Sequence, residues 1–216
     1  MTNGDILKFL RDLSANNSKG WMDANRDRYN AARNFWLSEL EVLLRRLAAY
    51  DERLLIVEPK DTVHRINNNR KFQPDLPLYK DNFTFTPYLK IVPASFHLSI
   101  SPKESFIGGG LYRPPADLLS KVRHAIDQDG DEFHSIVTGP GFVSFYGGLD
   151  LEEPVLATAP KGFSREHPHI NYLRMKSFIA IKYIDEETVC SDGLFDLVEE
   201  AFIRIKPLID FLNRAI

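Results

Sequence analysis

The sequence predicts an α+β fold, in which an antiparallel sheet carries helices from both chain ends packed on one face. Two observations lead to this prediction. Apolar residues recur at helical spacing near both ends of the chain, and runs rich in alternating, β-branched and aromatic residues lie between them. The chain has 216 residues, a length typical of one large domain, so we expect a single α+β domain over residues 1–216.

Two helices are predicted at the amino-terminal end. The segment GDILKFLRDLSANN places four apolar residues at helical spacing, Ile6, Phe9, Leu10 and Leu13. The polar stretch SANNSKG then interrupts the pattern. Asp23 is predicted to be the N-cap of a long helix over residues 23–50, where an apolar stripe runs from Tyr29 to Leu47.

The periodicity changes at Leu54. Strands are predicted in LLIVEP, TVHRI, TFTPYLKIV, SFHLSIS and ESFIGGGLY, and a further one in KSFIAIKYI. Residues 92–94 and 101–104 contain proline and polar residues typical of tight turns. Their spacing fits an antiparallel meander.

Helical periodicity returns in PPADLLSKVRHAI and in the carboxyl-terminal SDGLFDLVEEAFIRIKPLIDFLNRAI. Prolines are tolerated at the start of the first helix. Pro207 stands inside the second helix and removes one of its hydrogen bonds, so we expect a kink or a restart there. Between the two helices lie a short apolar piece, FVSFYG, and a proline-containing connector, APKGFSREHPH.

Composition excludes several classes of protein. The apolar fraction of 44% and charged fraction of 26% are typical of a soluble globular protein. The net charge is −3 and the isoelectric point is about 6.1, whereas nucleic-acid-binding domains often exceed a pI of about 9, so nucleic acid is an unlikely partner. Cys190 is the single cysteine, which suits a reducing compartment. Neither a signal peptide nor an apolar run of membrane length is present, so we expect a cytoplasmic protein without a membrane partner.

Positive charge gathers in HRINNNRKFQPDLPLYKDNF, residues 64–83. If the alternation around Val63 and Ile66 marks a strand, Arg65 presents a planar guanidinium on a sheet face, and Lys80 adds a point charge. Such groups suit a phosphate or a carboxylate. The alternative is that Arg65 and Lys80 pair structurally with Asp75, Asp81 or other carboxylates. A further alternative is contact with RNA or single-stranded DNA through the interleaved aromatic residues, Phe72, Tyr79, Phe83 and Phe85.

Other motifs have a structural interpretation beside a functional one. Gly108–Gly110 matches no phosphate-binding fingerprint, and a bulge or a tightly packed strand is favoured, with Tyr112 and Arg113 as pocket-edge residues. EHPH contains two histidines and a carboxylate, but no third metal ligand at recognisable spacing, so no metal site or cofactor is predicted. Cys190 is interpreted as a small hydrophobe rather than a nucleophile. His97 is the histidine best placed for acid–base work, although a hydrogen-bonded structural role is favoured.

Four segments occur in a recognisable order: FLRDLSANNSKGWMDANRDRY, HRINNNRKFQPDLPLYKDNF, FHLSISPKESFIGGGLYRPP and APKGFSREHPHINYLRMKSF. Together they resemble an uncharacterised family known as the domain of unknown function 2461, over roughly residues 5–185. The resemblance implies a single α+β domain and no particular activity. The matching positions are Asn17, Trp21, Arg65, Phe72, Asp75, Tyr79, Lys80, Gly109, Gly110, Tyr112, Pro160, Lys161, Gly162 and Pro168.

We therefore expect a cleft beside the sheet that binds an anionic or phosphorylated small molecule. Its predicted ligand-binding residues are Arg65, Lys71, Tyr79, Lys80, Tyr112 and Arg113. Whether the ligand is turned over is left open, and His97 or Asp75 is then the candidate for proton transfer. The alternative is a non-catalytic protein-interaction module in which the same cations are structural. A deep pocket favours the first interpretation and a flat apolar patch the second.

Overall fold

The computed structural model describes residues 1–71, 73–89, 91–151 and 155–216. The chain divides into two compact units, each assembled from three stretches of sequence. Unit 1 consists of Met1–Leu89, His97–Ile107 and Tyr183–Glu199, and unit 2 of Lys90–Phe96, Gly108–Lys182 and Glu200–Ile216. The expectation of a single domain over residues 1–216 stays a prediction beside this division.

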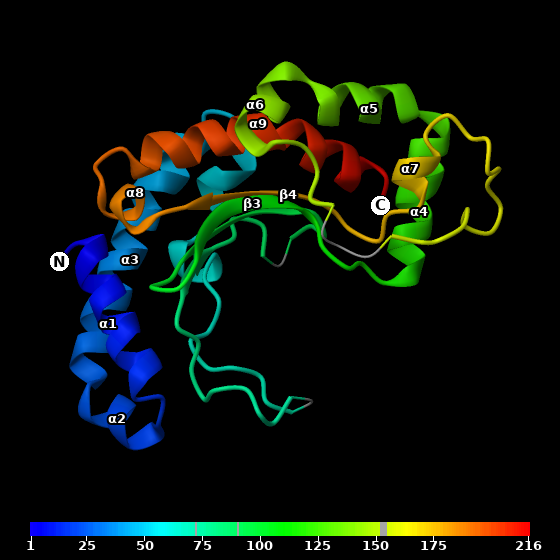
Figure 1. Ribbon diagram of the computed structural model, residues 1–216. Coiled ribbons are helices and arrows are strands. Elements are labelled where there is room, and N and C mark those ends of the chain that lie inside the picture. Colours follow the sequence, from blue (N-terminus) through cyan, green and yellow to red (C-terminus); the bar gives the residue numbers. More distant parts are fainter. Residues whose placement is uncertain (72, 90, 152–154) are drawn as a thin grey trace. The chain divides into compact units, whose positions relative to one another are not determined.

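Unit 1 begins with three helices, α1 (Asn3–Ala15), α2 (Lys19–Ala24) and α3 (Arg26–Leu47) (Figure 1). The Thr2 side chain and Asp5 form a capping box that fixes the start of α1. Ser18 caps α2 by accepting a hydrogen bond from the backbone of Trp21. The prediction that Asp23 caps one long helix is wrong, because Ser18 starts a helix five residues earlier and Asn25 is the N-cap of α3.

Helices α1 and α3 contact each other within unit 1 and bury their apolar stripes. Trp36 lies at the centre of this packing with 1% of its surface exposed. Its indole Nε1–H donates to the carbonyl of Thr84 at 3.0 Å, and its ring lies 6.5 Å from that of Phe83. A buried indole is thereby both packed and hydrogen-bonded, which fixes α3 on the strand.

The segments LLIVEP and TVHRI are not strands. The first forms η1 (Glu52–Ile56), a 3₁₀ helix capped by the Asp51 side chain, and is followed by η2 (Pro59–Asp61). Of the apolar run only Leu54 is buried, whereas Leu55 and Ile56 are 72% and 88% exposed. Leu55 and Ile56 are adjacent and both face solvent because the backbone here follows a 3₁₀ helix, which explains the error.

The sheet has four strands in the order β1-β2-β3-β4. They are β1 (Phe83–Phe85), β2 (Ser95–Ile100), β3 (Ser105–Leu111) and β4 (Phe178–Ile184). In unit 1, β1 pairs antiparallel with β2, and Phe83 faces Ile100 across the ladder. The predicted α+β fold with an antiparallel sheet is confirmed. Of the strand predicted in TFTPYLKIV, only Thr84 and Phe85 belong to β1, which begins at Phe83, and Lys90 lies outside the described residues.

The run of glycines in β3 lets its backbone approach that of β4 closely within unit 2. A Cβ added to Gly108 would lie 2.3 Å from the Ala180 carbonyl oxygen, and one on Gly110 would lie 2.0 Å from that of Phe178. Gly110 also has φ of 117°, a conformation that L residues avoid. The structural interpretation of this run, a tightly packed strand, is therefore confirmed.

Unit 2 contains α4 (Ala116–Gln128), α5 (Gly130–Thr138), α6 (Pro140–Tyr146) and α7 (Ile170–Leu173). The apolar piece FVSFYG lies in α6, which begins at Pro140 and ends before Gly147 in the left-handed conformation. Phe133 is fully buried, and its ring lies 5.9 Å from that of Phe178 and 5.2 Å from that of Phe211. These aromatic contacts form the core of the unit.

Two helices lie near the carboxyl-terminal end of the chain, α8 (Glu186–Cys190) and α9 (Leu194–Arg214). Pro207 stands inside α9, which is continuous, so no restart occurs there. Within unit 2, Phe202 of α9 packs edge-on against Phe96 of β2 at 5.4 Å. In the described part of the chain, every helix is too short or too polar to cross a membrane.

Candidate functional site

The described residues of the cation-rich segment, 64–71 and 73–82, form a loop in unit 1 that folds back on itself before β1 begins at Phe83. Asn67 and Tyr79 form an isolated antiparallel bridge, and Lys80 N–H donates to the Ile66 carbonyl at 2.7 Å. The Asn68 side chain donates to the Pro77 carbonyl at 2.9 Å. Arg65 therefore lies on a loop and not on a strand face, contrary to the alternation around Val63 and Ile66.

An asparagine from outside the loop fixes its position. Asn17 donates from Nδ2 to the Tyr79 carbonyl at 2.8 Å, and Oδ1 of Asn17 accepts from Tyr79 N–H at 2.9 Å. The side-chain amide thus satisfies both backbone groups of a buried residue, in the way a neighbouring strand would. This pair of bonds holds the residue immediately before Lys80.

A cleft of about 470 Å³ lies in unit 1 beside this loop. Its volume falls in the range of small-molecule sites, roughly 300–1,000 Å³. Most of the residues that line it are polar or charged, with a few aromatic and apolar side chains among them. The lining residues are Ser14, Asn17, Asn68, Leu76, Pro77, Tyr79, Lys80, Asp81, Asn82, Ser99, Ser101, Lys103, Glu104 and Phe106.

Lys80 is the cation of this wall that has no carboxylate partner among the residues the structure describes. Its ammonium donates to the Arg65 carbonyl at 2.9 Å, and partial burial lowers its pKa. Asp81, the neighbour expected to pair with it, instead forms an ion pair with Lys103 at 2.5 Å. The structural pairing of Lys80 with Asp81 is therefore wrong, and one ammonium charge of the cleft is left unneutralised.

His97 lies on β2 next to one wall of the cleft. Its Nδ1 is 2.7 Å from Thr86 Oγ1, and its ring packs 5.4 Å from that of Phe106 and 5.9 Å from that of His64. Burial, and to a smaller extent His64, lowers the pKa of His97 to about 4, so the imidazole is neutral near pH 7. The pKa of His64 is lowered by burial of its ring and then by the charge on Lys80. His97 is thus hydrogen-bonded, as its structural interpretation required.

The predicted ligand-binding residues do not all meet at this cleft. Tyr79 and Lys80 line it. Arg65 and Lys71 lie on the same loop, but their side chains are exposed and not part of the lining. Tyr112 and Arg113 belong to unit 2, where the Arg113 guanidinium lies 5.1 Å from the centroid of the Tyr112 ring.

Comparison with known protein families agrees with the sequence motifs. A family model described as a conserved hypothetical protein, DUF2461, matches residues 5–211. The chain belongs to this family. The resemblance drawn from the ordered motifs is confirmed and extends further toward the carboxyl terminus. No curated protein and no solved structure matches the chain.

Two further predictions concern aromatic and acidic residues of the loop. Phe72 lies outside the described residues, and Asp75 is exposed and is not among the residues that line the cleft.

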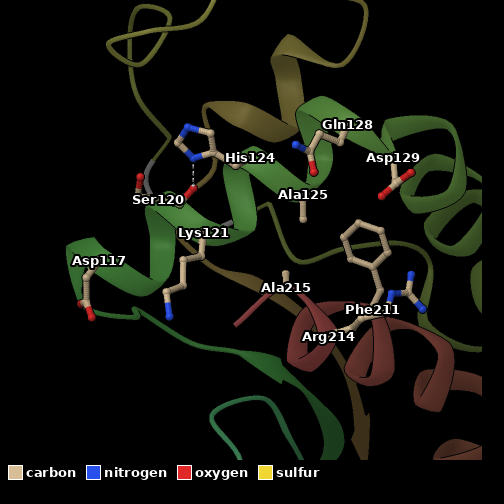
Figure 2. Close-up of a pocket in the computed structure, with 10 residues that line it drawn as sticks. All are labelled: Asp117, Ser120, Lys121, His124, Ala125, Gln128, Asp129, Phe211, Arg214 and Ala215. Carbon is tan, nitrogen blue, oxygen red and sulfur yellow. Dashed lines mark hydrogen bonds between the residues drawn. The ribbon is translucent and has the colours of Figure 1, made fainter.

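This DUF2461 protein has a larger cavity, of about 710 Å³, in unit 2 (Figure 2). Its basic side chains are already engaged. Lys121 donates to the Ile216 carbonyl at 3.0 Å, and the Nδ1–H of His124 donates to the Ser120 carbonyl at 2.7 Å, the dashed contact in Figure 2. Arg214 forms two bonds with the Glu132 carboxylate, at 2.6 and 2.7 Å. Lys121, like Lys80, donates to a main-chain oxygen. We take the smaller cleft of unit 1 as the candidate site because two of the predicted ligand-binding residues, Tyr79 and Lys80, line it.

The remaining candidates have structural partners. His167 and His169 each place Nε2 within hydrogen-bond distance of a carboxylate, that of Asp127 at 3.1 Å and that of Asp131 at 3.0 Å. Among the described residues no group of three or more histidine, cysteine and acidic side chains is placed to hold a metal ion. Cys190 is exposed, so its interpretation as a buried small hydrophobe is wrong. Partial desolvation and the neighbouring Glu186 raise the pKa of its thiol, which disfavours the thiolate.

Sequence reasoning missed several residues of the cleft wall, chiefly Asn82, Ser99, Glu104 and Phe106. Two signals were present in the sequence. The alternation of SFHLSIS places Ser99 on the same face as His97, and SPKE was recognised as the turn that follows. Only the fold shows that this turn and the loop around Lys80 line the same cleft.

Proposed function

We propose that this protein binds an anionic small molecule at the Lys80 end of the cleft in unit 1. The single observation that supports the proposal is the environment of Lys80. Its ammonium is partly buried, lines a cleft of about 470 Å³ and has no carboxylate within 4.0 Å among the described residues. A partly buried charge of this kind gains stability from an opposite charge on a ligand.

Neighbouring groups add to the attraction. The His64 imidazole is close enough to Lys80 for the ammonium to lower its pKa. An anion bound at Lys80 would reverse this effect, since a nearby negative charge favours the protonated imidazole. Arg65 contributes its carbonyl to the position of Lys80, and its guanidinium has no ion-pair partner in the described chain. The ligand would thus meet the Lys80 ammonium on a loop that Asn17 holds in place, which reduces the entropy lost on binding.

Thermal-shift measurements test the proposal with phosphates, sugar phosphates, nucleotides and dicarboxylates. A ligand at about 100 times its dissociation constant should stabilise the fold by roughly 2.7 kcal/mol. Lys80→Met removes the charge and keeps most of the aliphatic stem, so we expect a folded variant that no longer responds. Lys8→Met is the matched control, because Lys8 is an exposed lysine of α1 in the same unit. A Lys80→Met variant that responds like the wild type contradicts the proposal.

One observation favours the alternative of a protein-interaction module. Leu55 and Ile56 expose most of their apolar surface on η1, and Val42 on the contacting helix α3 is 48% exposed. Exposed apolar groups of this kind often mark partner surfaces. If this face binds a partner, a double substitution of Leu55 and Ile56 by Asp abolishes that binding and leaves the thermal response to anions unchanged.

A further inference from the structure

We infer that the ligand of this cleft is a phosphate monoester that carries several hydroxyl groups, as phosphorylated sugars and nucleoside monophosphates do. Its phosphate lies on Lys80, and its hydroxyl groups lie on the wall formed by Asn82, Ser99 and Glu104. The inference rests on the proposed anion site and specifies the ligand that this site takes.

The charges of the wall exclude a compact polyanion. Lys103 and Asp81 neutralise each other at 2.5 Å. Two charged residues of the lining then remain, Lys80 with a positive charge and Glu104 with a negative charge. Glu104 has no ion pair or hydrogen bond among the residues that the structure describes. A bare polyphosphate would meet the Glu104 carboxylate and be repelled. A ligand with one anionic group and hydrogen-bond donors elsewhere matches this wall.

Asn82 and Ser99 supply the groups that recognise a hydroxyl. Asn82 Nδ2 donates to Ser99 Oγ at 2.8 Å. This bond leaves Asn82 Oδ1 as an acceptor, and it leaves the Ser99 hydroxyl proton as a donor that no described residue uses. Ser99 is 2% exposed, so the side chain is fixed and its polar group has little access to bulk water. A ligand hydroxyl, which donates and accepts at once, satisfies both groups.

Phe106 provides an apolar surface for the carbon face of a sugar or for a base. It lines the cleft, and its ring is held by the His97 ring at 5.4 Å and by the Tyr183 ring at 6.4 Å. Aromatic neighbours at these distances fix the orientation of the ring before a ligand arrives. A site with one cation, several hydroxyl partners and one aromatic wall is therefore suited to a hydroxylated phosphate monoester.

Isothermal titration calorimetry with four probes tests the inference: methyl phosphate, glucose 6-phosphate, adenosine 5′-monophosphate and glucose. We expect at least one of the two hydroxylated phosphates to bind about tenfold or more tightly than methyl phosphate, because its hydroxyl groups gain hydrogen bonds to Asn82, Ser99 and Glu104. Glucose should show no binding at the same concentrations. The comparison between glucose 6-phosphate and the nucleotide identifies which source carries the hydroxyl groups.

Three substitutions separate this inference from the proposed anion site. Asn82→Ala and Glu104→Ala should each weaken the hydroxylated phosphate about tenfold and leave methyl phosphate unchanged, while Lys80→Met abolishes both. Glu187→Ala, an exposed acid on α8 of the same unit, is the control for lost negative charge. Circular dichroism spectra establish that each variant is folded, and Ser99→Ala replaces Asn82→Ala if that variant is not.

The outcomes are distinct. If methyl phosphate and the hydroxylated phosphates bind equally and Lys80→Met abolishes all of them, the anion site stands and this inference is overturned. Binding of the hydroxylated phosphates that persists unchanged in Asn82→Ala, Ser99→Ala and Glu104→Ala overturns it as well. If no phosphate binds at all, both the proposed function and the inference fail.

Discussion

The side-chain amide of Asn17 forms hydrogen bonds with both backbone groups of Tyr79. Its nitrogen lies 2.8 Å from the Tyr79 carbonyl oxygen, and its oxygen lies 2.9 Å from the Tyr79 nitrogen. The two residues are separated by 62 positions in the chain. Because Tyr79 is buried, these backbone groups have little alternative access to water. This side chain therefore joins the loop that carries Lys80 to the segment that follows α1.

Asn17→Ala is expected to destabilise the fold by about 2 kcal/mol, since it leaves a buried N–H and a buried carbonyl without partners. It should also weaken any anion response that depends on Lys80. Urea denaturation and the thermal-shift titration measure the two effects. Asn30→Ala is the matched control, an exposed asparagine of α3 whose loss should change stability by about 0.5 kcal/mol or less. An Asn17→Ala variant as stable as this control would show that the clamp is not needed.

Asp51 is the buried acid that caps η1 and joins it to Tyr88. It accepts hydrogen bonds from Arg53 Nε at 2.9 Å and from the Tyr88 hydroxyl. Arg53, followed by Tyr88, holds the pKa of the Asp51 carboxyl well below its usual range, although burial opposes them. An acid with a depressed pKa adds stability above its unfolded pKa, about 3.9, and this stability is lost as the pH falls toward the folded pKa.

Asp51→Asn should therefore cost about 2 kcal/mol near pH 7, the value of hydrogen bonds to a charged group. The difference in unfolding free energy between wild type and variant should shrink as the pH is lowered below about 4. Denaturant titrations between neutral and acidic pH measure it. Asp192→Asn, an exposed acid of the same unit, serves as the control. A difference that stays constant with pH would mean that the Asp51 charge is not the cause.

Gly110→Ala is expected to prevent folding of unit 2 or to destabilise it by more than about 3 kcal/mol. The new Cβ would overlap the Phe178 carbonyl oxygen at 2.0 Å, and φ of 117° would be strained by any side chain. Gly20→Ala is the matched control, because a Cβ there meets nothing within 4 Å and α2 gains helix propensity. Soluble yield and denaturation curves compare the two. Equal stability would refute the packing argument.

The sequence alone predicted three of the four strands. SFHLSIS, ESFIGGGLY and KSFIAIKYI contain β2, β3 and β4, because each is a run of strand length rich in β-branched, aromatic and other apolar residues, or in small residues that admit a neighbouring strand. LLIVEP failed because two of its apolar residues, Leu55 and Ile56, are exposed and the backbone follows a 3₁₀ helix capped by Asp51. Local composition does not distinguish an apolar run that is buried from one that is not.

The candidate site was predicted in part. Lys80 and Tyr79 were identified from the charge and stiffness of their segment, and both line the cleft. Asn82, Ser99 and Glu104 were missed, since each lies in a different local context and only the pairing of β1 with β2 and the turn after β2 bring them to one wall. Tyr112 and Arg113 were grouped with Lys80 on composition, and the structure places them in the other unit. Spatial convergence of this kind depends on tertiary contacts, which no single segment encodes.

His97 gives the fold a pH dependence whose direction follows from its surroundings. Burial beside Thr86, Phe106 and His64 lowers the folded pKa of His97 to about 4, whereas an unfolded histidine titrates near 6.5. Between these values the unfolded chain binds the proton and the folded protein does not. Stability is therefore lost as the pH falls from about 6.5 to 4, by up to about 3 kcal/mol.

His97→Gln keeps a hydrogen-bonding partner for Thr86 and removes the titrating imidazole. The free energy of unfolding of this variant should therefore fall less than that of the wild type over this pH range. His64→Gln, the control, removes a group whose pKa is shifted in the same direction but is less buried. Denaturant titrations across the window decide the matter: if His97→Gln loses stability as steeply as the wild type, another group dominates, and the imidazole is not buried as a neutral side chain.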